Sequence, residues 1–507
     1  MIMKKVLVSI VLMVLYGLCM AKPRIISSEP CEYRDVSCDR YGYQNWFKEE
    51  ISYSQALEDL DMLVYLLKSS YSGYEDAVKR GLKIESITES FKKSNTENEN
   101  IKVSQLNEFI YDFLKPYIQD SHFCIESKNL QNRLITQHRV LYSDIYVRKS
   151  GEVFVVEKSD TQEFKAGENL EPESENLFLY PSEGSCIYRI GTYATMDENE
   201  KCISVNCSGS EKQILCNISN NYLYWNDITT YKEIETKDSV YIYIPTLMDL
   251  HNNDNRKKKL EENFEKFHSV SSRYPEKKNI ILDLRTNGGG SSHHSSSFLA
   301  NLYFLEKNCN QKKSFVNIKK EWMLIGSNGD KIDLISPPVL QAEIWLSKYV
   351  YSQEAGWIKD FARRKKVLDN RNLRITYSEQ KKVKPKSGTP RFKGRLIILS
   401  GKNTCSSSEL AIFEARTIFS KTNQFFQIGE NTGGCYAYGN VWCYQLNNSG
   451  IALHLPSIII PFSEKCPEGL GMIPDYWATN DDILKAVVNI TCDEELSEKL
   501  KDMNNNL

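Results

Sequence analysis

The stretch "NIILDLRTNGGG" (residues 279–290) places a short apolar run directly before three glycines. A continuous apolar run of this length is typical of a strand that is buried on both faces, as in a parallel sheet. In the turn that follows, Gly288 to Gly290 allow backbone N–H groups to point at one spot without side-chain obstruction. Such a turn can hold a developing oxyanion. Composition alone equally allows a flexible turn.

A second buried strand, "RLIILS" (395–400), also runs into a polar turn, "GKNTCSSSELAIF" (401–413). The turn leads into a helix that we expect to start at Ser408. The N–H groups at the start of a helix favour negative charge, so a serine hydroxyl here could act as a nucleophile. Alternatively, Ser408 with Glu409 merely caps the helix.

Strand and helix patterns alternate around these two turns. "SVYIYIP" (239–245) predicts another strand and "LEENFEKFHSV" (260–270) a helix. This alternation predicts an α/β fold from residue 239 onward. A long charged insertion lies at 304–391.

The chain before residue 239 divides into a helical and a β-rich part. From Ser54 to about Leu114 apolar residues recur at three- and four-residue steps, which predicts a helical bundle. Between about Arg139 and Trp225 short alternating runs are separated by Gly, Ser and Asn turns, which predicts a small β domain.

Composition excludes several classes of function. The 507 residues carry 64 basic and 66 acidic side chains, which are interspersed, so we expect no nucleic-acid partner. Residues 1–21 combine two lysines, an apolar run and a small-residue stretch ending at Ala21, which predicts a secretory signal peptide. Processing at Cys19 to give a lipid anchor is the alternative. No later stretch is long and apolar enough to predict a membrane span.

Export would place the cysteines in a compartment where disulfides persist. Removal of Cys19 leaves an odd number of the 14 cysteines, so we expect disulfides and one thiol that stays free or pairs between chains. The cysteines that lie near one another in the sequence are Cys31 and Cys38; Cys202, Cys207 and Cys216; and Cys435 and Cys443. No histidine stands at ligand spacing beside them, so we expect neither a metal nor another cofactor.

Four motifs resemble, in order, those of one enzyme family: "DLRTNGGG", "LSGKNTCSSSE", "IGENTGG" and "PEGLGMIPD". They are similar to D-x-R-x-N-G-G-G, T-A-S-A-S-E, G-E-x-T-x-G and E-G-x-G-x-x-P-D of the C-terminal-processing, or tail-specific, serine peptidases, which include the tricorn core protease and interphotoreceptor retinoid-binding-protein branches. The resemblance covers residue 239 to about 483, and "QDSHF" (119–123) extends it back to about 54.

The resemblance implies a crotonase-like ββα-spiral catalytic domain, and the β region sits where many relatives have a PDZ domain. The expected segments are a signal peptide (1–21), an N-terminal segment with a helical bundle (22–136), a small β-rich, PDZ-like domain (137–236), a catalytic domain (237–490) with an insertion (304–391), and a C-terminal tail (491–507).

Position by position, the resemblance implies that Ser406 is the nucleophile. Many relatives use a lysine base after G-E-x-T, but this chain has Cys435 at that place. The tricorn-like branch takes a histidine from a Ser-His pair instead, which implies His122 as the general base, with Glu468 and Ser121 orienting it. The unperturbed pKa of histidine, about 6.5, suits this role near neutral pH.

The resemblance also implies an oxyanion hole made by the backbone N–H of Gly289 or Gly290 with that of Ser407. His293 and His294 follow the glycine turn and remain rivals for the base. Adjacent side chains seldom converge on one ion, so the two histidines do not predict a metal site.

We therefore expect an exported serine endopeptidase that acts on peptides or unfolded proteins through an acyl-enzyme. The alternatives are a catalytically inactive relative that binds peptides or small hydrophobic ligands in the same cleft, and an adhesion or surface-structure role that uses 304–391. The sequence does not predict the oligomeric state.

Overall fold

The computed structural model of the chain describes residues 37–39, 47–97, 100–128, 130–182, 185–218, 227–249, 256–303, 321–324, 376–379, 392–419, 424–459 and 466–504. The expected signal peptide (1–21) lies outside these residues. So does the expected insertion at 304–391, apart from two short strands. The chain forms two units. The first comprises Met1–Leu134, Lys319–Lys381 and Tyr438–Pro461, and the second comprises Ile135–Ile318, Lys382–Ala437 and Phe462–Leu507.

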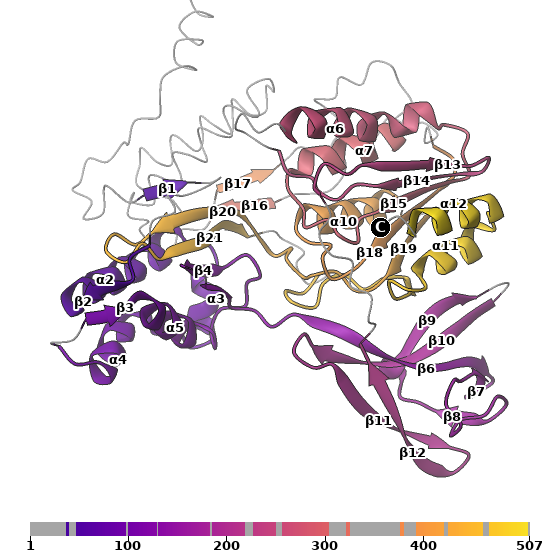
Figure 1. Ribbon diagram of the computed structural model, residues 1–507, viewed down its shortest axis with the longest axis horizontal. Coiled ribbons are helices and arrows are strands. Elements are labelled where there is room, and N and C mark those ends of the chain that lie inside the picture. The colour runs from indigo at the N-terminus through magenta and orange to yellow at the C-terminus, as the bar shows by residue number, and fades with distance from the viewer. Residues whose placement is uncertain are drawn as a thin grey trace, which may run out of the picture. The chain divides into compact units, whose positions relative to one another are not determined.

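A mixed sheet lies at the centre of the second unit (Figure 1). Its strands, in spatial order, are β13 (Lys232–Glu235), β14 (Ser239–Tyr243), β15 (Asn279–Asp283), β18 (Arg395–Ser400), β19 (Phe425–Gly429) and β22 (Tyr476–Trp477). All neighbours from β14 to β22 run parallel, and β13 pairs antiparallel with β14. Parallel neighbours bring the carboxyl ends of β15 and β18 to the same edge, and the glycine and serine turns start there.

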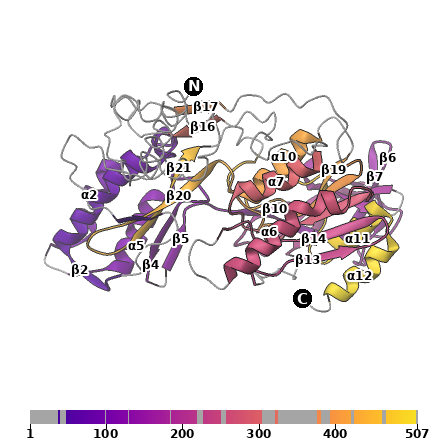
Figure 2. The ribbon, with the colours of Figure 1, turned by 90° about the horizontal axis from the view of Figure 1, so that it is seen from above.

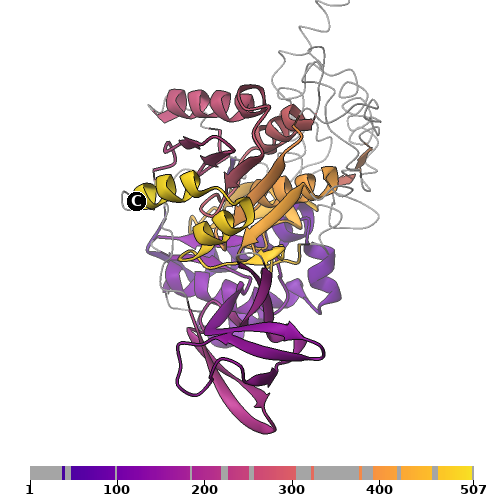
Figure 3. The same ribbon diagram turned by 90° about the vertical axis from the view of Figure 1, so that its right-hand side faces the viewer.

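Helices cover this sheet: α6 (Arg256–Arg273), α7 (Ser292–Tyr303), α10 (Ser407–Ile418), α11 (Ile483–Thr491) and α12 (Glu494–Asn504). Alternate strand residues face opposite sides of a sheet. On one side Tyr241, Ile281 and Ile397 share a buried core with residues of α11 and α12. In Figure 3 these two yellow C-terminal helices lie along one side of the sheet. Ile280 and Ile398, one residue along, are buried as well. The sheet is therefore buried on both faces, as the continuous apolar runs predict.

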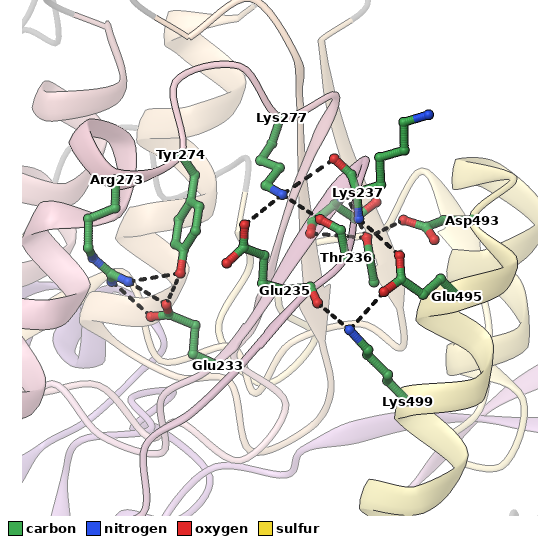
Figure 4. A network of polar contacts seen from close by, with 11 residues as sticks. Glu233, Glu235, Thr236, Lys237, Arg273, Tyr274, Lys277, Asp493, Glu495 and Lys499 are labelled. Atoms are coloured by element: carbon green, nitrogen blue, oxygen red, sulfur yellow. Dashed lines mark hydrogen bonds and ion pairs between the residues drawn. The ribbon is translucent and has the colours of Figure 1, made fainter.

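The residues expected as a C-terminal tail (491–507) contain helix α12, which is bound to β13 and the following turn (Figure 4). The Thr236 hydroxyl donates to Asp493 at 2.6 Å, and the Lys237 N–H donates to Glu495 at 3.0 Å. The Asp493 carboxylate also accepts the N–H of Leu496 at 3.0 Å, which caps the start of the helix.

The second unit also contains an antiparallel sheet that lies in the expected β-rich segment. Its order is β12-β11-β8-β7-β6-β10-β9. The strands are β6 (His138–Ser150), β7 (Val153–Lys158), β8 (Asn169–Glu171), β9 (Leu177–Ser182), β10 (Ser185–Thr195), β11 (Glu200–Cys207) and β12 (Ser210–Asn217). They enclose a hydrophobic core of their own. The α/β prediction therefore holds as a mixed fold with several sheets.

The first unit contains the helices that the N-terminal periodicity predicts. They are α2 (Tyr53–Ser70), α3 (Tyr74–Lys79), α4 (Ile87–Ser94) and α5 (Val103–Leu114). At the start of α2, Ser52 and Gln55 exchange hydrogen bonds in a capping box. Helix α5 ends at Leu114, two residues before Pro116, which cannot continue a helix.

A seven-stranded sheet completes the first unit (Figure 2). Its strands are β1 (Ser37–Asp39), β4 (Cys124–Ser127), β5 (Leu130–Arg133), β16 (Glu321–Leu324), β17 (Thr376–Glu379), β20 (Tyr438–Gln445) and β21 (Ala452–Ile459). A separate short pair is formed by β2 (Glu50–Ser52) and β3 (Asn100–Lys102). Strands β20 and β21 come from a late part of the sequence and share a buried core with the N-terminal helices.

Two further findings concern the described residues only. The cysteines among them carry free thiols: Cys124, Cys202, Cys207, Cys216, Cys405, Cys435, Cys443, Cys466 and Cys492. None of the described helices has the length and apolar character needed to cross a bilayer.

Candidate active site

Asn287 connects the glycine turn after β15 to the serine turn after β18. Its side-chain oxygen accepts the Gly289 N–H at 2.9 Å and the Ser408 hydroxyl at 2.8 Å. Its backbone oxygen accepts the Cys405 N–H at 3.2 Å. The two turns that the sequence separates by more than a hundred residues therefore form one local structure.

Only glycine fits the end of the glycine turn. Gly289 has φ +99° and Gly290 has φ +136°, which side chains rarely adopt. A Cβ on Gly289 would lie 2.9 Å from the Ser406 Cβ, and a Cβ on Gly290 would lie 2.2 Å from the Leu247 carbonyl carbon. The turn thus brings bare backbone against Ser406.

Gly290 directs its peptide groups toward the serine turn. Leu247 pairs with Gly290 in a parallel bridge, in which Leu247 binds the Gly289 carbonyl and the Ser291 N–H. The groups of Gly290 itself therefore face the other way, and its carbonyl accepts the Ser407 hydroxyl at 2.6 Å. Within the part of the chain that the structure describes, no acceptor is bound to the Gly290 N–H or to the Ser407 N–H. The Gly289 N–H, by contrast, is engaged by Asn287.

Ser406 has an unusual backbone conformation, with φ +55° and ψ −119°. Residues other than glycine rarely adopt it, and the strain is on the order of 1–3 kcal/mol. Ser208 and Cys492 are the other described non-glycine residues with positive φ. Strain of this kind persists only where surrounding contacts enforce it.

The structure corrects the expected start of helix α10. The helix starts at Ser407 with Ser406 as its N-cap, whereas we expected Ser408 to start it. The Ser408 hydroxyl instead binds Asn287, so Ser408 is committed to joining the two turns. This leaves Ser406 at the point where the positive end of the helix begins.

Glu409 holds the strained serine in place. Its carboxylate is fully buried and accepts the N–H groups of Ser406 at 3.0 Å, Gly434 at 2.8 Å and Cys435 at 2.8 Å. The Thr432 hydroxyl also donates to it. Burial raises the pKa of Glu409, and these hydrogen bonds oppose that rise. Sequence reasoning took Glu409 only as part of a helix cap, and the Glu of the T-A-S-A-S-E pattern was the available signal for more.

Buried Lys402 lies beside the same turns, with the charge of Glu430 nearby, and was also missed. The Lys402 ammonium donates to the Thr432 carbonyl at 2.9 Å. Burial lowers the pKa of Lys402 to about 8. Burial raises the pKa of Glu430 to about 7, although the nearby Lys402 charge opposes the rise. A lysine thus lies near the Ser406 turn at a position other than the one the family motif uses.

Glu468 lies next to the turn that contains Cys435. Its carboxylate accepts the Ala437 N–H at 2.6 Å. The neighbouring glycines allow this loop to pack closely, since a Cβ on Gly469 would lie 2.5 Å from the Thr136 carbonyl and one on Gly471 would lie 2.2 Å from the Thr432 carbonyl. The closing motif therefore packs against the turn that Glu409 holds.

The predicted site residues are divided between the two units. The second unit contains Ser406, Ser407, Gly289, Gly290 and Glu468, and the first unit contains His122 and Ser121. In the first unit, the backbone N–H of His122 donates to the Asp120 carboxylate at 2.8 Å. Burial lowers the pKa of His122 to about 4, with a smaller effect of Arg133. The imidazole is therefore neutral near pH 7, as a proton acceptor must be.

His294, a rival for the base, has both ring nitrogens engaged. One lies 2.7 Å from Asp249 and the other 3.2 Å from His268. The ring also stacks on Phe264, with centroids 3.5 Å apart. These contacts leave His294 no ring nitrogen for a serine hydroxyl. His293 beside it is exposed. Among the described residues, no group of three or more His, Cys, Asp or Glu side chains is arranged to hold a metal ion.

Residues 238–477 match the family model described as Peptidase family S41. No curated protein matches the chain. Similar solved structures include mature CPAF (15% identity, 85% of this chain and 94% of that chain, TM-score 0.46) and a putative S41 protease from Bacteroides fragilis (12%, 88% and 97%, 0.37). The photosystem II D1 C-terminal processing protease is another (12%, 84% and 94%, 0.33).

The family match and the α/β unit with its serine and glycine turns define a serine-type peptidase, a hydrolase. Residues 238–477 of the chain belong to peptidase family S41, the C-terminal-processing peptidases. The family predicted from the motifs is thus confirmed.

Proposed function

We propose that this chain is an exported endopeptidase that hydrolyses peptides or unfolded proteins through an acyl-enzyme on Ser406. The conformation of Ser406 is the observation that carries the proposal. A serine that only capped a helix would need no positive φ, whereas an attacking hydroxyl must project from its turn. Glu409, Asn287 and the glycine turn supply the contacts that enforce this conformation.

The oxyanion hole we propose consists of the N–H groups of Gly290 and Ser407. Within the described part of the chain neither has a bound acceptor, and the Ser407 hydroxyl joins the two residues. The bond from Gly289 to Asn287 favours Gly290 over Gly289. Each such donor contributes about 3 kcal/mol to lowering the barrier.

We propose His122 as the general base, with Ser121 and Glu468 orienting it. Two observations support His122 over other groups. Its imidazole is neutral at pH 7, and both nitrogens of His294 are engaged elsewhere. The Cys435 thiol cannot replace the family's lysine as a base, because its pKa lies well above the usual value.

The finer features of the fold and location belong to the same proposal. We propose that 237–490 adopt a crotonase-like spiral and that 137–236 are a PDZ-like domain. Residues 1–21 would direct the chain out of the cytoplasm. The substrate would be an extended polypeptide with its reacting carbonyl between Ser406 and the Gly290 N–H, and no metal or other cofactor would be required.

The test is labelling with a fluorophosphonate together with hydrolysis of casein. The full-length chain should react, and Ser406→Ala should lose both activities. His122→Gln should lose at least about a hundredfold in rate, because a general base contributes about 10² to 10⁴. Ser497→Ala in α12 is the matched serine control and should keep full activity. Undiminished labelling of Ser406→Ala would reject the proposal.

The second candidate is a relative that binds peptides in the same cleft without cleaving them. The buried thiol of Cys435 in place of the lysine favours it. In that case casein would bind but stay intact, and the fluorophosphonate would not react with any serine.

A further inference from the structure

Cys405 and Cys435 lie on two turns that are joined through their backbones. The Gly433 N–H donates to the Thr404 carbonyl at 2.9 Å. The N–H groups of Ser406 and Cys435 both donate to the same Glu409 oxygen, at 3.0 Å and 2.8 Å. The residue before the nucleophile and the residue at the family's lysine position are therefore neighbours in space.

The side chains of these residues are also in contact. The Cys405 thiol donates to the Lys402 carbonyl at 3.7 Å and packs against Gly433, where a Cβ would lie 2.1 Å from the sulfur. The Cys435 thiol is in hydrogen-bonding contact with Cys405, and this contact, followed by burial, holds its pKa well above the usual range. A contact between two cysteine side chains on turns that are joined through their backbones is an arrangement from which a disulfide can form.

We propose that Cys405 and Cys435 are a disulfide-forming pair, and that the crosslink braces the turn that carries Ser406. The formation of this bond does not depend on Ser406 being a nucleophile. The third thiol of the region, Cys466, has a different partner, since it donates to the Glu409 carboxylate at 3.3 Å.

The oxidant in the proposal is a low-molecular-weight disulfide such as oxidised glutathione. The Cys405 thiol is half-buried and the Cys435 thiol is buried, so the small disulfide reaches Cys405 first. The Cys405 thiolate attacks one sulfur, forms a mixed disulfide and releases one glutathione thiolate. The Cys435 thiolate then attacks the Cys405 sulfur and releases the second. Two protein thiols are thus oxidised, and their two protons and two electrons pass to the two glutathione molecules.

Lys402 supports both steps. Its pKa of about 8 leaves the amine mostly protonated at neutral pH, and its charge interacts favourably with thiolates at both Cys405 and Cys435.

The test is peptide mapping of the full-length chain after incubation with oxidised glutathione and alkylation of the remaining thiols. Trypsin with chymotrypsin separates Cys405 (403–410) from Cys435 (427–436) and from Cys443. We expect a crosslinked pair of these two peptides and alkylated Cys492, an exposed thiol of the same unit. Alkylation of both Cys405 and Cys435, or linkage of either to Cys466, would overturn the proposal.

A stability measurement provides an independent readout. Reduction of the oxidised wild type should lower the unfolding midpoint by about 5 °C, because a crosslink of this loop length limits the unfolded chain. Cys405→Ser, Cys435→Ser and the double variant should lose this shift, while Cys492→Ser should keep it. If the shift survives in the double variant, another disulfide causes it and the proposal is wrong. Peptide mapping needs no catalysis, so an inactive protein would reject the proposed function and leave this inference testable.

Discussion

Ser406 has a conformation that glycine would adopt without strain, so its presence there works against stability. Natural sites keep such strain where function requires it. The contacts that hold Ser406 come from Glu409 and from the glycine turn, and neither would be needed for a helix cap alone.

Replacement of Ser406 by glycine should stabilise the fold relative to replacement by alanine. At φ +55° glycine relieves the strain, and we expect Ser406→Gly to exceed Ser406→Ala by about 1 kcal/mol in free energy of unfolding. At Ser497, inside α12, the order should reverse, because glycine is about 1 kcal/mol worse than alanine in a helix. Urea denaturation of the four variants measures both differences. If glycine and alanine ranked in the same order of stability at both sites, the backbone strain assigned to Ser406 would be contradicted.

Glu409→Gln should destabilise the second unit. A glutamine would turn an NH₂ group toward N–H donors that now share the carboxylate, and at least one of them would lose its acceptor. The expected cost is about 2–4 kcal/mol. The matched change at exposed Glu498 should stay within about 0.5 kcal/mol. Urea denaturation measures both. A loss of stability no larger than that of the Glu498 control would show that Glu409 does not hold Ser406 in its conformation.

The sequence motifs indicated the proposed reacting residues better than the residues that support them. Ser406 and the glycines stand at fixed places in a pattern, and the structure brings them together. The buried positions of Glu409 and Lys402 depend on contacts with the turn at 432–435, and no local pattern encodes these contacts.

At the scale of elements, residues at the start and in the middle of α12 contact the sheet. Asp493 caps the helix and accepts the Thr236 hydroxyl. Leu496 and Leu500 lie in the core beneath the sheet. The end of the chain is thus part of the fold of the second unit.

Leu500→Ala should lower the free energy of unfolding of the second unit by about 2–5 kcal/mol, because the side chain is buried and its loss leaves a cavity. Lys501→Ala, which changes an exposed neighbour, should have almost no effect. Urea denaturation measures the free energy of unfolding of both variants. An equally small effect at Leu500 would mean that α12 contributes little to the core.

Asp493 should link stability to acid pH. Its hydrogen bonds to Ser239, Thr236 and Leu496 hold its pKa below the ordinary value, although burial opposes them. A lowered pKa in the folded state gives stability that is complete above the unfolded pKa of about 3.9 and is lost as the pH falls through the folded pKa. Asp493→Asn should therefore reduce the difference in unfolding midpoint between pH 6 and pH 3. An unchanged difference would contradict the link.

Helical spacing predicted α2 and α5 correctly, because an amphipathic helix repeats its apolar face locally. The same helical spacing is present in α12, where Leu496 and Leu500 are four residues apart, although we expected residues 491–507 to form a tail. Strands β16 and β17 lie in a charged segment with no alternating pattern, so no local signal predicts them.

At the scale of the whole molecule, the chain leaves the second unit at residue 438 and returns to it at 462. Strands β20 and β21 therefore belong to the same unit as the N-terminal helices. The division could not be predicted, because it depends on contacts between residues hundreds of positions apart. His122 and Ser406 belong to different units.

The proposed base predicts the pH dependence of fluorophosphonate labelling. With a pKa of about 4, His122 is about 90% neutral at pH 5, whereas an unperturbed histidine would be only about 3% neutral. Labelling should therefore stay nearly constant from pH 7 to pH 5 and fall by half near pH 4. A half-maximum near pH 6.5 would exclude His122 in this environment. Circular dichroism at each pH checks that the chain stays folded.

Glu409 and the turn at 432–435 that it contacts also bind residues in and next to the closing motif "PEGLGMIPD" (467–475). Cys466 binds Glu409, and the Met472 N–H binds the Thr432 hydroxyl at 2.7 Å. A ribosome makes these residues long after Ser406. During translation Ser406 is therefore present before the contacts that enforce its conformation can form, and products of early termination would carry Ser406 without them. The order of synthesis thus delays assembly of the proposed site until residues 466–472 have been made.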